Sequence, residues 1–408
     1  MKKAVTLLLV LLLTGCTANP ATDMPPNTNI DPATLSEDTF AVDSGDHTVR
    51  MLFVNAGKAD CTILEADGKI YLIDTGEDSS VPQILAALAY MDTEAIEAVF
   101  LTHSDKDHIG GWNGIRQRYS IGKLYTAALN EAPDTYAALA NEIPYETLTP
   151  GQSVPIGDEG LYLDVLCPIT LYPDEENNNS LILRLDIQRL DIQRLDCGKE
   201  TVLFTGDMKE LEEADLLATG YALDCDILKV PYHGRKGASS QAFLDACTPN
   251  LSIICCNTET DPDTANEKVI ARLRQTGEVR LTEDADLGWC IDLQDTFRYI
   301  TNAKIEVPPT ASLTITDVSI EDQTITIENT GDTTDLTGYY LYSDRGSELF
   351  VFPEGTVLPA GESITIGCVG SNEALIWAGE TNVWHKSKKD NAILYDRYGN
   401  ELDTKRAK

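Results

Sequence analysis

The residues most suited to chemistry lie close together in the stretch Leu101–Gly111, Leu-Thr-His-Ser-Asp-Lys-Asp-His-Ile-Gly-Gly. Two histidines and two carboxylates occupy positions His103, Asp105, Asp107 and His108. Imidazole and carboxylate are ligand types that suit zinc, manganese or iron. A solvated polar loop explains any one of these residues, but it explains poorly all four together in a chain with 5 histidines. The stretch therefore predicts a metal site.

Further candidates also stand where apolar, strand-like segments end. They are Asp74 after residues 69–73, Asp207 after 201–205 and His233 after 226–230. The stretch at 103–108 itself follows the apolar run 98–101. Sites of α/β proteins are usually built where several strand ends meet at one edge of a sheet. We therefore expect these side chains to converge.

The elements that must position them alternate along residues 47–302. Strand patterns come first, at 49–54, 61–65 and 69–73. Helical patterns, such as those at 81–91 and 109–119, then alternate with further strands. This order predicts two packed sheets with helices on their outer faces, an αββα sandwich.

The C-terminal part has a different pattern. Residues 303–312 contain two adjacent prolines and predict a linker. From 313 to 408 the helical patterns vanish, and short alternating strands are separated by turn residues. This pattern predicts a small all-β, Ig-like sandwich.

The N-terminus carries a targeting pattern. Two lysines precede the apolar segment Val5–Leu13, which is too short to span a bilayer comfortably. Leu-Thr-Gly-Cys16 resembles the lipobox of bacterial lipoproteins, which implies a signal peptide over 1–16 and lipidation of Cys16. Residues 17–46 would then be a flexible tether, and the protein would sit on the extracellular face of the bacterial cytoplasmic membrane. A plain secretory signal with a chance cysteine is the alternative.

Composition limits the partners. The net charge of −35 argues against binding nucleic acid through a broad basic surface. It leaves a phosphodiester substrate open, because a bound divalent metal reverses the local charge. The cysteines after Cys16 form no Cys-x-x-Cys pair, so they indicate neither a structural zinc site nor a disulfide framework.

The region 48–301 resembles the metallo-β-lactamase superfamily, whose first metal motif is His-x-His-x-Asp-His. Asp105 stands where the second histidine is usual. The resemblance implies one or two divalent ions, zinc or manganese. Its second metal site would contain Asp107, His108, Asp207 and His233, with Asp207 bridging both metals. The first site would retain His103 and Asp105, and its missing third histidine falls in 177–180, at Asn179 and Ser180.

The resemblance also implies roles around the metals. Asp74 would orient a ligand histidine, as carboxylates beside metal sites do. Lys229 would offset the charge of a phosphate, with a surface lysine as an equally good explanation. Asp107, Asp207, Asp74 and Lys229 are therefore the predicted catalytic residues.

Six segments resemble more closely the extracellular hydrolase domain of ComEC-type DNA-uptake proteins. They are Phe-Val-Asn-Ala-Gly-Lys-Ala-Asp60, Leu-Ile-Asp-Thr-Gly76, Ser-Asp-Lys-Asp-His-Ile-Gly-Gly111, Asn-Ser-Leu-Ile-Leu-Arg184, Leu-Phe-Thr-Gly-Asp207 and Leu-Lys-Val-Pro-Tyr-His-Gly234. Asn55 and Tyr232 depart from that pattern. The C-terminal part resembles the lamin-tail domain through segments such as Ile-Thr-Ile-Glu-Asn-Thr-Gly331 and Leu-Pro-Ala-Gly361.

These resemblances imply a surface-anchored, metal-dependent phosphodiesterase or nuclease acting on extracellular DNA. A metal would lower the pKa of water and supply hydroxide. One alternative keeps the fold and metal but takes a small ester, thioester or lactam as substrate. Another is a non-catalytic surface-binding protein with a degenerate metal site.

Overall fold

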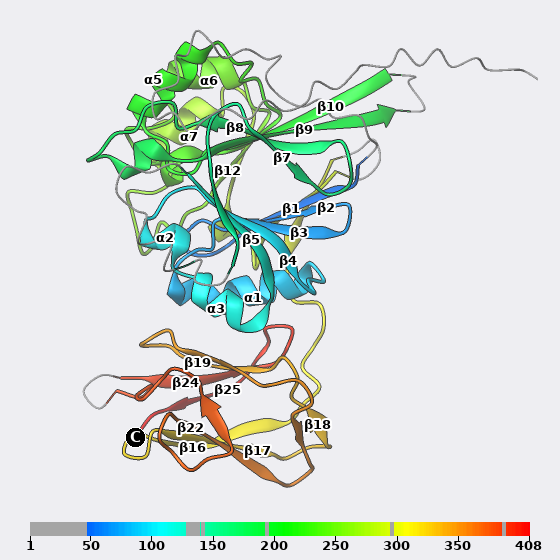
Figure 1. Cartoon of the computed structure of the whole chain (residues 1–408), viewed down its shortest axis with the longest axis vertical. Helices are drawn as coiled ribbons and strands as arrows, with labels where there is room; N and C mark the ends of the chain where they lie inside the picture. The colour runs from blue at the N-terminus through cyan, green and yellow to red at the C-terminus, as the bar shows by residue number, and fades with distance from the viewer. Residues whose placement is uncertain (1–46, 128–138, 140–142, 192–195, 294–297, 386–388) are drawn as a thin grey trace, which may run out of the picture.

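The computed structural model describes residues 47–127, 139, 143–191, 196–293, 298–385 and 389–408. The predicted signal segment 1–16, tether 17–46 and lipidation site Cys16 lie outside the described residues. Four layers form the N-terminal part, with two facing sheets between two layers of helices, and a separate β-sandwich lies below them (Figure 1). The predicted αββα sandwich followed by an all-β sandwich is confirmed.

The first sheet has 8 strands and changes from antiparallel to parallel pairing along its width. In spatial order it contains β15 (Tyr299–Ala303), β14 (Gly288–Asp292), β1 (Val49–Val54), β2 (Thr62–Ala66), β3 (Lys69–Ile73), β4 (Ile96–Leu101), β5 (Ile121–Ala127) and β6 (Tyr145–Leu148). The neighbours from β3 to β6 run parallel, so their C-terminal ends lie at one edge.

The second sheet has 7 strands and the same mixed character. Its order is β13 (Glu278–Leu281), β12 (Leu251–Ile254), β11 (Ile227–Lys229), β10 (Asp196–Phe204), β9 (Ile182–Asp191), β8 (Leu161–Cys167) and β7 (Ser153–Ile156). The neighbours from β10 to β13 are parallel, which brings the ends of β10 and β11 together.

Side chains alternate between the two faces of each strand and so contribute to two hydrophobic cores, one on each face of the sheet. In β1, Met51 and Phe53 face the space between the sheets, while Leu52 and Val54 face the helices. This follows from the two-residue period of a strand. The rings of Phe53 and Phe204 stack across the gap with centroids 6.2 Å apart, which joins the two sheets.

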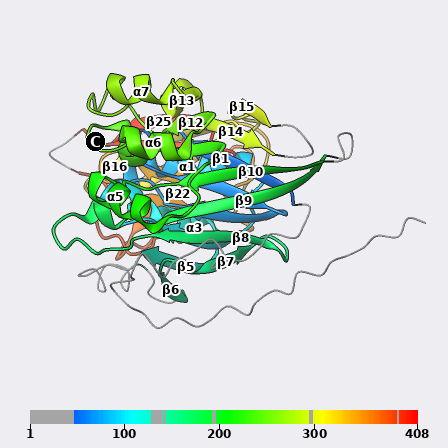
Figure 2. The same cartoon turned by 90° about the horizontal axis from the view of Figure 1, so that it is seen from above.

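Helices cover the outer faces. On the first sheet lie α1 (Val81–Tyr90), α2 (Lys106–Ile109) and α3 (Trp112–Arg118), and on the second lie α5 (Glu210–Thr219), α6 (Gln241–Cys247) and α7 (Glu267–Leu273). Figure 2 looks onto this outer face, with α5, α6 and α7 on the side of the second sheet nearer the viewer. Within the described residues, no helix combines the length and apolar character needed to cross a bilayer.

The helix predicted at 109–119 is present as α3, but it begins at Trp112, and the short α2 precedes it as a separate turn. A side chain at Gly111 would place its Cβ only 2.0 Å from the Thr75 carbonyl oxygen. The chain therefore passes against the Thr75–Gly76 backbone, and Gly111 N–H donates to Gly76 O at 3.0 Å. This contact fixes the loop that carries His108.

The C-terminal sandwich packs two sheets around its own core. One sheet contains β16 (Leu313–Ser319), β17 (Thr324–Asn329), β22 (Ser363–Cys368) and β23 (Leu375–Trp377); the other contains β20 (Leu349–Val351), β19 (Tyr340–Ser343), β24 (Asn391–Tyr395) and β25 (Glu401–Arg406). The short strands β18 (Thr334–Asp335) and β21 (Val357–Leu358) pair separately. The sheet with β19 and β20 lies against α1 and α3, and Tyr340 joins the core of the first sheet.

Candidate metal centre

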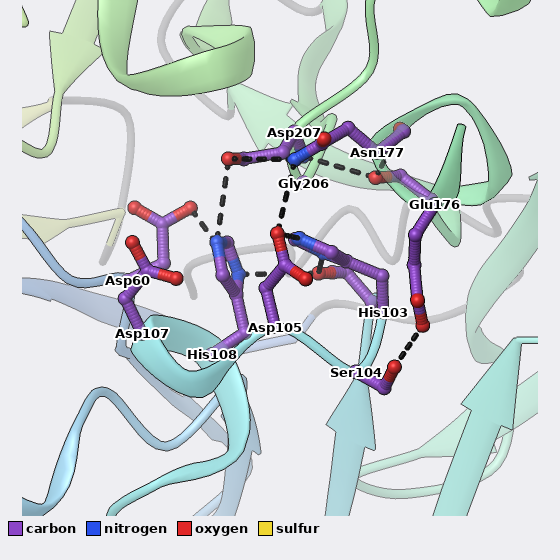
Figure 3. Close-up of polar contacts among 12 residues, drawn as sticks. Asp60, His103, Ser104, Asp105, Asp107, His108, Glu176, Asn177, Gly206 and Asp207 are labelled. Carbon is purple, nitrogen blue, oxygen red and sulfur yellow. Dashed lines mark hydrogen bonds and ion pairs between the residues drawn. The ribbon is translucent and has the colours of Figure 1, made fainter. Parts of the chain in front are cut away.

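The site lies where strand ends of both sheets meet. Asp74 follows β3, His103 and His108 follow β4, and Asp207 follows β10. His233 stands in the short 3-10 turn Pro231–Gly234 after β11. The expected convergence is therefore present, and the polar ends of His103, His108 and Asp207 gather in one space (Figure 3).

Asp74 fixes the protonation of His108. The Nδ1–H of His108 donates to Asp74 Oδ2 at 2.7 Å, so the Nε2 atom carries the free lone pair. That Nε2 lies 3.3 Å from Asp207 Oδ1. Asp74 is itself held by the backbone N–H and the hydroxyl of Thr102, each at 2.7 Å.

The same carboxylate acts on His103 through Thr102. Because the Thr102 hydroxyl donates to Asp74, it accepts from Nδ1 of His103, 3.1 Å away. The Nε2 of His103 is thus left free as well, 3.6 Å from Asp105 Oδ2. One aspartate therefore sets the tautomers of two histidines.

His233 is aimed by a left-handed turn. Tyr232 and His233 have φ of 53° and 51°, a conformation that L residues rarely adopt, and Gly234 follows with φ of 67°. Nδ1 of His233 donates to the carbonyl of Cys255 at 3.1 Å. Its Nε2 then faces Asp207 Oδ2 at 3.2 Å.

Asp207 is the residue around which the histidines gather. Its backbone N–H donates to Ser180 Oγ at 3.0 Å, and Gly206 before it has φ of 47° and no room for a side chain. Burial opposes its ionisation, yet His233 and His108 hold the pKa of Asp207 well below its ordinary value. Burial would likewise lower the pKa of His108, but Asp207 and Asp74 hold it well above its ordinary value. The carboxylates Asp207 and Asp74 therefore favour a positive charge between them.

Asp60 belongs to the centre and was missed as a ligand candidate. One donor atom from each of Asp60, His108, Asp207 and His233 lies within 4.8 Å of the others. Asp60 stands in the loop between β1 and β2, where its N–H donates to Asp107 O at 3.0 Å. The only signal was a carboxylate within the ComEC-like segment ending at Asp60, which carries no histidine.

Lys229 lies beneath this group. It is 4% exposed, forms an ion pair with Asp60 and donates to Gly206 O at 2.9 Å. The alternative of a surface lysine is therefore wrong. Burial alone would lower the pKa of Lys229, but Asp60 and Asp207 raise it above its ordinary value. Its predicted action on phosphate stays a prediction, and its contacts are those of a counter-charge for Asp60.

Asp105 and Asp107 stand at the rim rather than inside the group of four. The side chain of Asp107 is 20% exposed, with Oδ2 3.8 Å from His233 Nε2 and 3.6 Å from Lys58 Nζ. The side chain of Asp105 is 47% exposed. Both carboxylates therefore face the solvent side of the histidines.

The predicted third-ligand residues Asn179 and Ser180 are directed elsewhere. The amide oxygen of Asn179 accepts from the backbone N–H of Tyr172 at 2.7 Å, and its amide nitrogen donates to the Tyr172 carbonyl at 2.9 Å. Ser180 donates to Asn177 O at 2.9 Å and accepts from Asp207. Instead Asn177 reaches the site, because the 3-10 turn Glu176–Asn179 rotates its neighbours away.

The residues fit a divalent metal ion. Nε2 of His103, His108 and His233 and Oδ1 of Asp207 are buried and lack hydrogen-bond partners among the described residues. Buried polar atoms are nearly always paired, so this shared lack needs a cause. Imidazole nitrogens oriented by partners on Nδ1, beside a carboxylate, form the donor set of zinc and related ions.

Family models match both parts of the chain. Residues 54–161 match the metallo-beta-lactamase superfamily, and residues 306–407 match the lamin tail domain. Among solved structures, the metallo-beta-lactamase fold protein YhfI from Bacillus subtilis has a TM-score of 0.40 at 12% identity, covering 60% of this chain and 99% of that one. Zn²⁺-bound PqqB from Methylobacterium extorquens has 0.36 at 14%, covering 57% and 86%.

Two curated proteins are related in sequence. Recombination protein 2 of Haemophilus influenzae is 28% identical over 225 residues, which are 54% of this chain and 24% of that protein. ComE operon protein 3 of Bacillus subtilis is 25% identical over 185 residues, 44% and 22% respectively. The match thus spans about a quarter of these relatives' length. This chain thus combines a region that matches the metallo-β-lactamase superfamily, with a buried Asp/His group suited to a divalent metal, and a region that matches the lamin tail domain.

Proposed function

We propose that this protein is a metal-dependent phosphodiesterase that cleaves DNA outside the cell. The observation that carries the proposal is the convergence of the free Nε2 atoms of His108 and His233 on Asp207, at 3.3 and 3.2 Å. A divalent ion at such a site supplies Lewis acidity and brings the pKa of water towards neutrality. Zinc and manganese are the metals we propose.

The chain's own residues would do the remaining work. Asp74 and Thr102 accept from Nδ1 of His108 and His103, so Nε2 is the ring atom that each histidine would offer to a metal. Lys229 balances Asp60, so the centre does not carry an unpaired buried carboxylate. The exposed rim around Asp105 leaves access from solvent for a substrate.

DNA is proposed as substrate from the relatives, Recombination protein 2 and ComE operon protein 3, and from the ComEC-like segments. The chain has a net charge of −35, and a bound cation would offset that acidity locally where a phosphodiester binds. That same charge favours a small ester, thioester or lactam as the second candidate substrate.

The test uses the purified protein on plasmid and single-stranded DNA with manganese or zinc. We expect cleavage that EDTA abolishes and that Asp207→Asn removes. Parallel assays with nitrocefin, a thioester and an aryl ester separate the second candidate. Less than about half an equivalent of bound metal, with no turnover of any substrate, would favour the non-catalytic alternative.

We further propose that lipidated Cys16 anchors the protein on the outer side of the membrane. Cys16→Ser should release the protein from membranes or leave it with an uncleaved signal. Membrane fractionation and mass spectrometry of the N-terminal peptide check this. A wild-type protein that lacks lipid and appears in the medium would favour the plain secretory signal.

A further inference from the structure

Lys58 places a positive charge on the solvent side of the metal centre. Its Nζ lies 3.6 Å from Asp107 Oδ2, and the same oxygen lies 3.8 Å from His233 Nε2. In Figure 3 the side chain of Asp107 lies on the same side of His108 as Asp60. The side chain of Lys58 is 39% exposed, so it is open to solvent. A molecule that reaches the centre beside Asp107 therefore also meets this lysine.

The loop that carries Lys58, between β1 and β2, is held at both ends. Asp60 N–H donates to the carbonyl of Asp107 at 3.0 Å, which ties the loop to the helix that carries His108. At the other end, Asn55 Nδ2 donates to the carbonyl of Ala285 at 2.9 Å. The backbone position of the lysine relative to the metal ligands is thus fixed, as a preorganised substrate contact requires.

The other basic side chains next to the ligands have partners of their own. Lys229 is buried and forms its ion pair with Asp60. Lys106, Lys209 and Arg235 pair with carboxylates outside the centre, namely Asp78, Glu175 and Asp261. Within the described residues, Lys58 has one ion-pair partner, and that partner is Asp107 of the centre itself. At 3.6 Å this pair is longer than a direct hydrogen bond, so the ammonium keeps donors for another acceptor.

The charges of the centre make such a donor useful for an anionic substrate. Asp105, Asp107 and Asp207 bring carboxylates to it, and a phosphodiester adds a further negative charge. A lysine ammonium binds phosphate oxygens through charge-assisted hydrogen bonds. We propose that Lys58 binds a nonbridging oxygen of a phosphodiester and so makes the centre select this substrate over a neutral ester. The buried Lys229 then serves Asp60, and Lys58 serves the substrate.

This inference rests on the proposed metal-dependent hydrolysis, and its test combines turnover with binding. Turnover is measured in manganese on bis(p-nitrophenyl) phosphate and p-nitrophenyl acetate, which share a leaving group and differ in charge. Binding is measured by fluorescence anisotropy with two short labelled DNA strands that resist hydrolysis, one with anionic phosphorothioate linkages and one with neutral methylphosphonate linkages. The variants are Lys58→Gln, which removes the charge, and Lys58→Arg, which keeps it. Lys69→Gln is the matched control, because Lys69 is 41% exposed and pairs with Asp158 at the opposite end of β3.

We expect Lys58→Gln to lower kcat/KM for the phosphodiester by about 10- to 100-fold, because a hydrogen bond to a charged group is lost. Hydrolysis of the acetate should stay nearly unchanged. The same variant should weaken binding of the phosphorothioate strand by about tenfold and leave the methylphosphonate strand unaffected. Lys58→Arg should keep most of both properties, and Lys69→Gln should behave as wild type.

Two results overturn the proposal. One is an equal loss of turnover for the phosphodiester and the acetate in Lys58→Gln, and the other is unchanged binding of the phosphorothioate strand in that variant. Failure of the proposed function looks different. In that case wild type hydrolyses neither ester in manganese, while the two DNA strands still show whether Lys58 contacts an anionic linkage.

Discussion

At the scale of single residues, one carboxylate controls two histidines. Asp74 accepts from His108 directly and from His103 through Thr102. Its φ of 59° lies in the left-handed region, which asparagine tolerates at least as well as aspartate. Asp74→Asn therefore changes the hydrogen bonding at this position while keeping the backbone and shape.

We expect Asp74→Asn to weaken binding of a metal at His108 by about 10- to 100-fold, because the amide can donate to Nδ1 and move the His108 proton to Nε2. Thr102→Val should weaken metal binding less, because it removes the link from Asp74 to His103 but leaves the direct contact between Asp74 and His108. Calorimetric titration of the metal-free protein measures both. Equal affinities in wild type and Asp74→Asn would show that the aspartate does not set the tautomers.

The buried ion pair between Lys229 and Asp60 leads to a prediction about stability. Replacing Lys229 by methionine leaves Asp60 buried at 3% exposure without its cation. In EDTA we expect the free energy of unfolding to fall by about 3–5 kcal/mol. The double variant Asp60→Asn/Lys229→Met should recover most of this loss. Urea unfolding measures each variant, and an equal loss in single and double variants would contradict the counter-charge role.

The raised pKa of Asp164 on β8 makes the stability of the folded protein depend on pH. Burial raises its pKa to about 7, although Ser153 Oγ donates to it at 2.6 Å. The unfolded carboxyl has a pKa of about 3.9, so between that pH and about pH 7 the folded protein binds a proton that the unfolded chain does not. Its contribution to stability therefore falls as pH rises through this window.

Asp164→Asn removes that proton. Between pH 5 and 8, wild type should lose about 2 kcal/mol of unfolding free energy relative to the variant. Urea unfolding at the two pH values gives the difference directly. A gap between the proteins that stays constant with pH would mean that Asp164 titrates normally.

At the scale of elements, the sequence predicted the positions that depend on strand ends. Asp74, His108, Asp207 and His233 were found because each follows an apolar segment whose end lies at one edge of a sheet. Asp60 and Asn177 were not assigned, because loop conformation brings them in. In particular, the choice of Asn177 over Asn179 depends on a 3-10 turn whose hydrogen bonds to Tyr172 and Ser180 no spacing rule gives.

The close approach of the backbone at Gly111, between α2 and α3, can also be tested. A Cβ at residue 111 meets the Thr75 carbonyl, so Gly111→Ala must displace either the Asp74–Gly76 loop or the loop carrying His108. We expect about 1–3 kcal/mol of destabilisation and weaker metal binding. Thermal unfolding and metal titration measure these effects. Asn113→Ala, exposed on α3, is the control and should behave as wild type.

At the scale of the whole molecule, the lamin tail domain packs directly on the hydrolase domain. Tyr340 is 1% exposed, stacks on Tyr395 at 4.9 Å and lies in the core with α1. Tyr342 Oη donates to the carbonyl of Asp78 at 3.3 Å, and Asp78 pairs with Lys106 on α2. The interface thus reaches the helix that carries His108.

Because the domains share this apolar contact, we expect them to unfold together in wild type. Tyr340→Ala removes the largest shared ring and should cost about 3–5 kcal/mol. It should also split the calorimetric transition in two, since the remaining contacts resemble an ordinary interdomain surface. Tyr398→Ala, 41% exposed on the same domain, is the control. A single unshifted transition in Tyr340→Ala would mean that the domains are coupled by other contacts, whereas loss of metal binding in that variant would show that docking also supports the His108 loop.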